Sequence, residues 1–292
     1  MSLLTIRFRS KKLATRIPLH VLLPDPPMGT DPAEFYRAGE KYRVLWLLHG
    51  GTETSEDFFY KYHLHTLLRG HKVIAVMPNA LNSDFQNHMG FGSGFPFIDF
   101  FFEELMPFVY ATFPASTDPA DNYLAGYSMG GSGASMLGFL HPEKFQGGIA
   151  PLGSGFRGGD FLGPYLHMNG SEFRTFALNN PTLFPTTFGD PAAGIKLKEI
   201  NMIAHYDTVR DYVDSPECTW KRFPEAVAGG KLPELYFCCG ELDTMTLECD
   251  QKILALAEEL GFSNISLDII PNCTHPQGAE IAMQRMIEHF HL

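Results

Sequence analysis

A five-residue stretch, Gly126-Tyr127-Ser128-Met129-Gly130, constrains the fold of this chain more than any other feature of its sequence. It directly follows the apolar run Tyr123-Leu124-Ala125 and directly precedes a helix-like segment over 131–140. A turn this tight between a strand and a helix strains the serine backbone, and glycine is needed on both sides because a side chain would clash there. The sequence therefore predicts a serine hydroxyl exposed at the carboxyl end of a strand.

The G-x-S-x-G pattern alone is weak, because a chain of this length contains one by chance roughly one time in ten. An alternative interpretation of Ser128 is a glycine-rich loop with a solvated hydroxyl. The pattern occurs once in this chain and has the strand–turn–helix context that a nucleophilic serine requires. We therefore predict that Ser128 is a nucleophile.

Composition excludes several classes of partner. The 292 residues carry a net charge of −11, with 22 Lys and Arg against 33 Asp and Glu, which argues against binding to nucleic acid or to anionic membrane surfaces. Only 19% of residues are charged and 25 are Phe, which suits a compact enzyme with an apolar pocket. No stretch approaches the roughly 20 apolar residues of a membrane span.

The N-terminus and the cysteines bear on where the chain works. Residues 1–7 lack the charged start and long apolar region of a signal peptide, so we expect a cytoplasmic location. Five cysteines, an odd number, do not suggest a disulfide framework. Cys238 and Cys239 are adjacent on a predicted strand, point to opposite faces and are expected to be buried thiols.

Strand-like and helix-like segments alternate along most of the chain, which predicts one α/β domain over 1–292 with a doubly wound, mostly parallel sheet. Alternating apolar residues at the N-terminus predict an antiparallel hairpin at a sheet edge. The segment of about 155–212 interrupts this rhythm and is rich in Gly, Pro, Asn and Phe. We interpret it as a cap inserted over the site, with aromatic rings that either line the pocket or form a satellite core. The expected hairpin strands are 3–8 and 17–23, the other strands are 44–48, 73–77, 123–125, 145–152, 235–239 and 265–270, and the main helices are 97–113, 131–140, 247–260 and 277–290.

A serine hydroxyl becomes a good nucleophile only when an oriented base takes its proton. When the serine sits on such a turn, an acid and then a histidine follow along the chain, each after a strand. Asp243 is the predicted acid, with Glu241 as the fallback and a helix N-cap as the alternative role. His275, after the last strand, is the predicted base. His63, His65 and His71 are close in sequence, but no cysteine or carboxylate cluster supports them, so we expect no metal site.

A tetrahedral intermediate needs two preorganised N–H donors for its oxyanion. One predicted donor is the amide of Met129, the residue after the serine. The other comes from the stretch Leu48-His49-Gly50-Gly51-Thr52, which follows a buried strand. Gly51 is the predicted donor there, and Thr52 is the fallback. The alternative is an ordinary glycine turn.

With these residues in place, the chain resembles the esterase D group of α/β-hydrolases, and within it the bacterial tributyrin-esterase, feruloyl-esterase and acetyl-xylan-esterase types. The resemblance covers most of the chain from about Val44 onward. It rests on Leu47-Leu48-His49-Gly50-Gly51, Met77-Pro78-Asn79, Phe102-Glu103-Glu104-Leu105-Met106-Pro107, Ala125-Gly126-Tyr127-Ser128-Met129-Gly130-Gly131, His141-Pro142-Glu143-Lys144-Phe145, Phe188-Gly189-Asp190, Cys239-Gly240-Glu241-Leu242-Asp243 and Thr274-His275.

The resemblance implies the α/β-hydrolase fold and ester hydrolysis through an acyl-serine intermediate, on short or aryl acyl chains and without a cofactor. Carried over to this sequence, it implies Ser128 as nucleophile, His275 as base, Asp243 as its orienting acid, and Gly51 and Met129 as oxyanion donors. Relatives often place an acidic or aromatic residue and a tryptophan after the histidine, whereas Pro276-Gln277-Gly278 follow here. This departure bears on substrate preference.

Other functions stay open at this point. The same group also hydrolyses the thioester S-formylglutathione, and an alcohol in place of water would make the protein an acyltransferase. A non-catalytic binding module that retained the fold is a third alternative, but the complete Ser–Asp–His order argues against it. The expected partner is a small-molecule ester, and the oligomeric state is left open, a homo-oligomer included.

Overall fold

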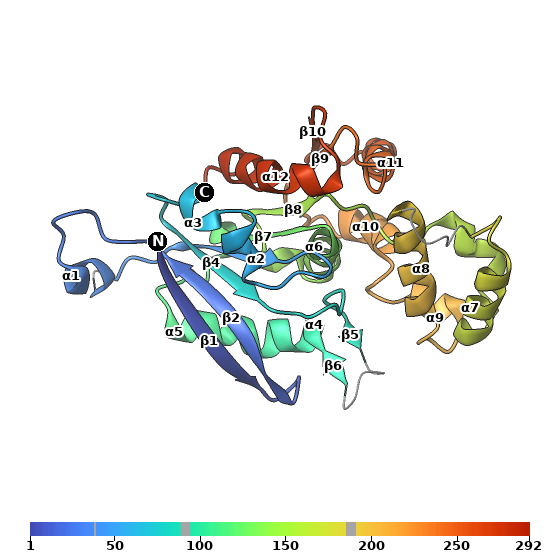
Figure 1. Cartoon of the computed structure of the whole chain (residues 1–292), viewed down its shortest axis with the longest axis horizontal. Coiled ribbons are helices and arrows are strands. Elements are labelled where there is room, and N and C mark those ends of the chain that lie inside the picture. Colours follow the sequence, from blue (N-terminus) through green and yellow to red (C-terminus); the bar gives the residue numbers. More distant parts are fainter. Residues whose placement is uncertain (38, 89–93, 185–190) are drawn as a thin grey trace.

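An eight-stranded sheet forms the centre of the computed structural model, which describes residues 1–37, 39–88, 94–184 and 191–292 (Figure 1). The strand order is β1-β2-β4-β3-β7-β8-β9-β10. The last six strands in this order pair in parallel, whereas β1 pairs antiparallel with β2 and β2 antiparallel with β4. The predicted mostly parallel sheet and its antiparallel edge hairpin are therefore confirmed.

The strands of this sheet are β1 (Ser2–Ser10), β2 (Thr15–Leu23), β3 (Arg43–Leu48), β4 (Val73–Pro78), β7 (Asn122–Tyr127), β8 (Gly148–Leu152), β9 (Leu235–Gly240) and β10 (Ile265–Ile270). A separate short hairpin pairs β5 (Asn87–His88) with β6 (Phe95–Pro96). The α-helices are α1 (Pro32–Arg37), α2 (Asp57–Tyr60), α3 (Leu64–Leu67), α4 (Phe97–Asp99), α5 (Met106–Thr112), α6 (Met129–Leu140), α7 (Gly170–Asn179), α8 (Pro191–Ile203), α9 (Val209–Val213), α10 (Thr219–Ala228), α11 (Leu247–Glu259) and α12 (His275–His289).

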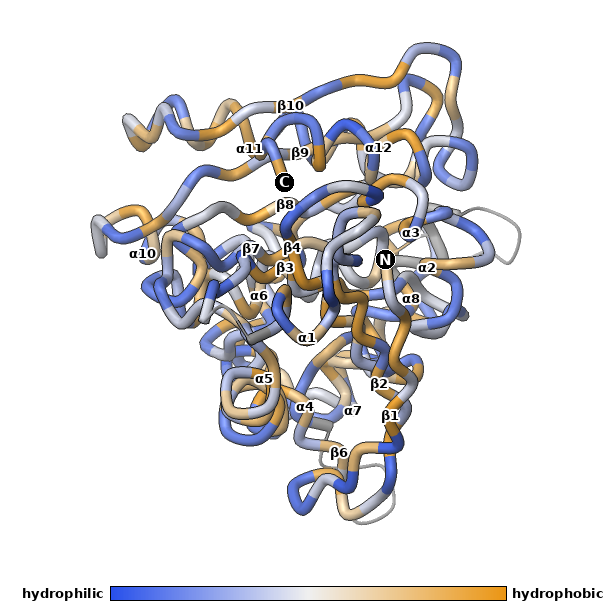
Figure 2. Tube along the Cα trace, turned by 90° about the vertical axis from the view of Figure 1, so that its left-hand side faces the viewer, coloured by the Kyte–Doolittle hydropathy of each residue, from blue (hydrophilic) through white to orange (hydrophobic). Residues whose placement is uncertain are grey.

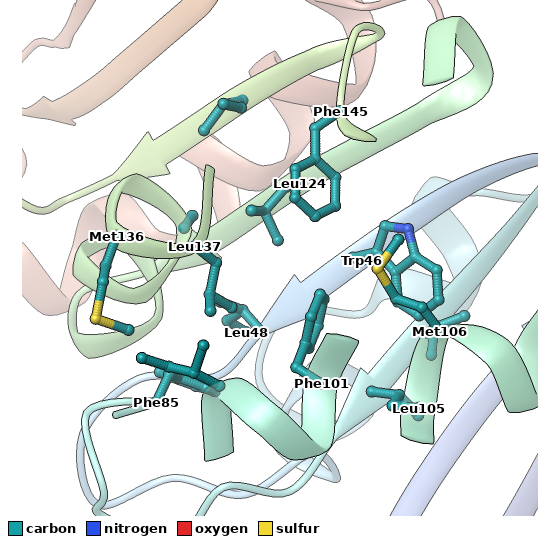
Figure 3. Close-up of a cluster of buried hydrophobic side chains, with 14 of the residues drawn as sticks. Trp46, Leu48, Phe85, Phe101, Leu105, Met106, Leu124, Met136, Leu137 and Phe145 are labelled. Carbon is teal, nitrogen blue, oxygen red and sulfur yellow. The ribbon is translucent and has the colours of Figure 1, made fainter. Parts of the chain in front are cut away.

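Buried clusters cover both faces of the sheet. Side chains alternate along a strand, so Trp46 and Leu48 of β3 enter the cluster under α4, α5 and α6, while Leu45 and Leu47 enter the cluster under α12. Figure 3 shows the first of these clusters around Trp46 and Leu48. Figure 2 shows hydrophobic segments gathered along β3 and β4, as expected for strands that are covered on both faces.

The predicted helix over 97–113 is interrupted. Between α4 and α5 the residues Phe100–Leu105 are π-helical, and the Met106 N–H donates to the carbonyl of Phe101, five residues back. The next residue, Pro107, has no N–H to donate to the preceding turn, so a regular α-helix cannot run through this point. The wider turn still buries Phe100 and Phe101 in the core.

The segment 155–212 forms a lobe with a small hydrophobic core of its own, which lies apart from the sheet at the right of Figure 1. It contains α7, α8, α9 and a 3₁₀ stretch, Asp160–Tyr165. Most of the aromatic rings that the sequence singled out pack against one another there, so they form the satellite core rather than an open pocket wall. These rings are Phe161, Tyr165, Phe173, Phe176 and Phe184. Phe156 joins the main core, and Phe188 lies outside the described residues.

One carboxylate ties this lobe to the sheet. Asp84 follows β4 and is almost fully buried, and it pairs with Arg157 and with Lys198 of α8, whose Nζ lies 2.8 Å from Asp84 Oδ1. Burial opposes ionisation of Asp84, but the charges of Arg157 and Lys198 hold its pKa below the usual value. The ion pairs therefore persist at neutral pH and fix α8 beside the loop after β4.

Candidate active site

Ser128 lies at the turn between β7 and α6, in the backbone conformation that the sequence predicts. Its φ and ψ are 56° and −114°, in a region that non-glycine residues rarely adopt. The Ser128 N–H donates to the carbonyl of Leu152 at 2.8 Å, which ties the turn to β8. The side chain is half-buried, so a substrate can reach the hydroxyl.

The flanking glycines are sterically required. A Cβ on Gly126 would lie 2.7 Å from the carbonyl oxygen of Leu48, and one on Gly130 would lie 2.8 Å from the carbonyl oxygen of His49 and closer still to that of Leu48. These neighbours are backbone atoms at the end of β3, which cannot rotate away. The close approach of β3, β7 and α6 therefore explains why the turn needs glycine.

We expect Gly130→Ala to destabilise the protein by more than about 3 kcal/mol, because the new methyl group overlaps the backbone of β3. The free energy of unfolding from urea titration measures the effect. Gly163→Ala is the matched control, since nothing lies within 4 Å of a Cβ at that exposed position. Equal stabilities for the two variants would contradict this account of the turn.

The predicted acid and base lie in hydrogen-bond contact. His275 begins α12 after β10, Asp243 follows β9, and His275 Nδ1 donates to Asp243 Oδ2 at 2.7 Å. Asp243 also accepts from the hydroxyl of Thr246 at 2.8 Å and from the N–H of Met245 at 2.9 Å. Burial opposes its ionisation, but these three hydrogen bonds and the His275 charge hold the pKa of Asp243 below its usual value. Asp243 is therefore ionised at neutral pH and can orient the imidazole.

The fallback acid lies elsewhere. The carboxylate of Glu241 accepts from the N–H of Asn272 at 2.9 Å and is exposed. The helix-cap alternative for Asp243 is met in part, because its carboxylate accepts the Met245 N–H at 2.9 Å and its carbonyl accepts the Leu247 N–H at 3.2 Å, although α11 itself begins at Leu247 with Thr246 as its N-cap. Of the two candidate acids, Asp243 is the one hydrogen-bonded to His275.

Tyr127 brings the histidine loop to the serine turn. Its hydroxyl donates to the backbone carbonyl of His275, and the centroids of the two rings lie 5.1 Å apart. Because Tyr127 directly precedes Ser128, this contact holds the start of α12 near the serine turn. Within the described residues Ser128 Oγ makes no hydrogen bond, and catalytic hydrogen bonds often tighten only when substrate binds.

The two predicted oxyanion donors also lie together. A Cβ on Gly51 would lie 3.8 Å from Met129 Cβ, so the loop after β3 reaches the start of α6. The N–H of Gly50 is occupied, because it donates to Glu53 Oε2 at 2.9 Å. Thr52, the fallback donor, is exposed and has a φ of 64°. Gly51 therefore lies beside Met129 at the start of α6, while the N–H of its neighbour Gly50 is already engaged.

Two of the three clustered histidines have separate partners. His63 pairs with Glu280 at 2.9 Å, and His71 contacts the carbonyl of Leu292. Across residues 1–37, 39–88, 94–184 and 191–292, no group of three or more His, Cys, Asp or Glu side chains could hold a metal ion. In the same ranges no helix combines the length and the apolar character that crossing a bilayer requires. All five cysteines are free thiols.

Asp250 is a buried carboxyl group that the sequence did not reveal. It lies on α11 and is 0% exposed, and among the described residues neither carboxyl oxygen has a hydrogen-bond partner of standard geometry, although the Cys239 thiol is adjacent. Burial, with a smaller contribution from the charge of Asp243, raises the pKa of Asp250 well above its usual value. On an amphipathic helix, one aspartate gives no sequence signal of this burial.

We expect Asp250→Asn to remove a pH dependence of stability. Because the folded-state pKa is raised, the Asp250 contribution is fully present below the unfolded pKa of about 4 and is lost as pH rises toward the folded value. Relative to the variant, the wild-type free energy of unfolding should fall by up to about 1.4 kcal/mol per pH unit above pH 4. Urea titrations at several pH values measure this, with the exposed Glu258→Gln as control. Parallel curves for wild type and Asp250→Asn would contradict the prediction.

Comparison with known proteins finds similarity to esterases. A family model described as "Putative esterase" matches residues 10–154. Two esterases from strains of Mycobacterium tuberculosis are 28% identical over 152 residues, which cover 51% of this chain and 30% of each relative. The match thus spans less than a third of those curated relatives.

Solved structures match over nearly the whole chain. An S-formylglutathione hydrolase from Staphylococcus aureus is 20% identical with a TM-score of 0.70, and a fluorophosphonate-binding serine hydrolase from the same organism is 19% identical with a TM-score of 0.73. In both cases the match covers 99% of this chain and 98% of the other. A ferulic acid esterase is 18% identical with a TM-score of 0.66, covering 99% and 96%.

The sheet, the serine turn and these structural matches define an α/β-hydrolase fold, as the sequence predicted. The family match and the sequence motifs point to esterases in particular, whereas the fold alone is shared by many hydrolases. Over residues 10–154 the chain is similar to the esterase family, which agrees with the esterase D-like resemblance of its motifs.

Proposed function

We propose that this protein is a serine carboxylesterase that hydrolyses short-chain or aryl acyl esters through an acyl-serine intermediate. The observation that carries the proposal is the hydrogen bond between His275 and the buried, ionised Asp243, which Tyr127 holds beside the strained Ser128 turn. A base oriented by an acid next to an accessible serine is the arrangement that activates a hydroxyl.

The chemistry follows from these positions. His275, with Nδ1 bound to Asp243, uses Nε2 to take the Ser128 proton as Oγ attacks the ester carbonyl. The N–H groups of Gly51 and Met129 stabilise the oxyanion, and His275 then gives its proton to the leaving alcohol. Water attacks the acyl-serine with the same base, and the acid is released. No step requires a cofactor.

We further propose that 155–212 acts as a cap that shapes the pocket. Two contacts of one loop support this. Asp84 in that loop forms ion pairs with Arg157 and Lys198 of the lobe. Two residues earlier, Asn82 Oδ1 would lie 3.7 Å from a Cβ on Gly51, so the same loop also borders the proposed oxyanion donor. The satellite core makes the lobe a rigid body rather than a loose loop. The buried free thiols Cys238 and Cys239 suit a reducing compartment and support a cytoplasmic location.

A substrate panel tests the proposed function. p-Nitrophenyl acetate, butyrate and octanoate, together with methyl ferulate, should be hydrolysed with a kcat/KM that falls steeply as the aliphatic chain lengthens. Failure to hydrolyse any of these esters would overturn the carboxylesterase assignment.

Thioester hydrolysis is the second candidate, favoured by the fold similarity to the S-formylglutathione hydrolase over nearly the whole chain. S-formylglutathione belongs in the same panel for this reason. A kcat/KM for this thioester that exceeds the best ester by more than tenfold would select the second candidate, and the reverse ranking would select the first.

A further inference from the structure

Glu53 lies three residues beyond Gly50, and its side chain is only 9% exposed. Its Oε2 accepts the Gly50 N–H at 2.9 Å, and a Cβ on Gly50 would lie 2.7 Å from the same oxygen. Glycine at position 50 therefore allows the carboxylate to lie directly against the backbone of the loop that carries Gly51. The esterase mechanism above assigns no task to this carboxylate.

The carboxylate is itself held in place from the opposite side. The hydroxyl of Tyr62 donates to both oxygens of Glu53, at 2.6 and 2.7 Å, and Lys61 forms an ion pair with Oε1. Tyr62 is 1% exposed, and its burial and the Glu53 charge raise its pKa, so its hydroxyl remains a donor at any working pH. A charge with this many partners has one stable position.

The loop that Glu53 contacts is strained. Thr52 has a φ of 64°, which is unusual for a β-branched residue, and the surrounding contacts must maintain it. The Glu53 N–H donates to the Gly50 carbonyl at 3.3 Å and closes the turn around Thr52. Without the Glu53 carboxylate, the Gly50 N–H would lose its hydrogen-bond acceptor. The turn would then lose one of the contacts that hold its conformation.

The direction of the Gly51 N–H depends on this same turn. In a trans peptide the Gly50 carbonyl and the Gly51 N–H point in opposite directions. The Gly50 carbonyl accepts from His49 Nδ1 at 2.8 Å, and the N–H of Ala80 donates to His49 Nε2 at 3.0 Å, which sets the tautomer. Fixing both sides of Gly50, by His49 and by Glu53, therefore fixes where the Gly51 N–H points.

We propose that Glu53 is a positioning residue for the oxyanion hole, which keeps the strained 50–52 turn in the conformation that presents the Gly51 N–H to the substrate oxygen. This inference rests on the proposed esterase function. Preorganised donors stabilise charge that develops in the transition state, so a loosened turn should lower kcat while substrate binding is retained. Lys61 offsets the negative charge that Glu53 places near the developing oxyanion.

The test compares Glu53→Ala, Glu53→Gln and the exposed control Glu56→Gln. For p-nitrophenyl butyrate we expect Glu53→Ala to lower kcat by about 10–100-fold with KM changed by less than about threefold, below the roughly 10²–10³-fold cost of deleting a donor outright. Glu53→Gln should recover a large part of the loss, because its amide oxygen can still accept the Gly50 N–H. Glu56→Gln should match the wild type.

A second readout separates positioning from a general loss of structure. Sulfur is a weaker hydrogen-bond acceptor than oxygen, so a thionoester gains less from the oxyanion hole than the matching ester. The ratio of kcat/KM for the ester to kcat/KM for the thionoester should therefore be lower in Glu53→Ala than in the wild type. In Glu56→Gln the ratio should equal that of the wild type. If Glu53→Ala fails to fold, Tyr62→Phe, which removes the donor to Glu53, replaces it in the same assays.

The outcomes distinguish the two levels of the proposal. An unchanged ester-to-thionoester ratio in the Glu53 variants, or a kcat equal to the wild type, overturns the role of Glu53 even when the wild type is an active esterase. A wild type that neither hydrolyses the ester nor reacts at Ser128 with a fluorophosphonate overturns the proposed function itself. A reduced ratio with partial recovery in Glu53→Gln supports both.

Discussion

Ser128→Ala is expected to abolish ester hydrolysis and to leave the fold intact. The hydroxyl makes no hydrogen bond within the described residues and lies half-buried at a turn, so its removal creates no cavity. The turn is fixed by Gly126 and Gly130 and by the hydrogen bond from the Ser128 N–H, which alanine retains. The remaining rate should come only from the oxyanion hole and substrate binding, so kcat should fall by roughly 10⁴–10⁶-fold.

The assay uses p-nitrophenyl butyrate, with circular dichroism and urea titration as checks on folding. Ser132→Ala is a matched control, because Ser132 lies one turn further along α6 and its Oγ contacts Ser154 Oγ at 3.4 Å, away from His275 and Asp243. A fluorophosphonate should label the wild type and Ser132→Ala but not Ser128→Ala. Near-normal turnover in a Ser128→Ala preparation free of wild-type enzyme would contradict the acyl-serine mechanism.

Asp243→Asn should lower kcat by about 10⁴-fold with little change in KM. An ionised Asp243 accepts the Nδ1 proton of His275, which leaves Nε2 free to take the serine proton. An asparagine at this position can donate to Nδ1 instead, and that favours the tautomer in which Nε2 carries a proton and cannot act as a base. Substrate contacts are unaffected, so the loss falls on kcat.

Glu241→Gln is the control for the acid assignment, because this exposed carboxylate contacts Asn272 rather than His275. It should retain the wild-type rate. If Glu241→Gln were the damaging change and Asp243→Asn the silent one, the acid assignment would be reversed.

Some parts of this molecule could be predicted because local sequence determines them. The glycines around Ser128 mark a turn that few other residues can form, and the long apolar runs at β3 and β4 mark strands covered on both faces. The positions of Asp243 and His275 followed from the rule that functional side chains gather after the carboxyl ends of parallel strands. The structure brings these two side chains together.

Other features depend on packing that one sequence does not encode locally. The rings of the 155–212 lobe could have lined a pocket or filled a core, because the same residue types do both. The position of Asp250 along its helix does not distinguish it from an exposed aspartate, and its burial becomes visible only in the folded structure. Glu53 and Tyr62 lie nine residues apart, and no motif signals that their side chains meet under the Gly50 turn.

The way the 155–212 lobe is attached affects how substitutions can alter such a protein during evolution. Its ion pairs converge on Asp84, in the loop after β4, whereas the proposed acid, base and nucleophile follow β9, β10 and β7. The proposed catalytic residues and the residue that anchors the lobe thus follow different strands. We therefore expect substitutions around Asp84 to tilt or reshape the proposed cap while the proposed catalytic residues stay in place, so that selectivity and reactivity can diverge along separate mutational routes.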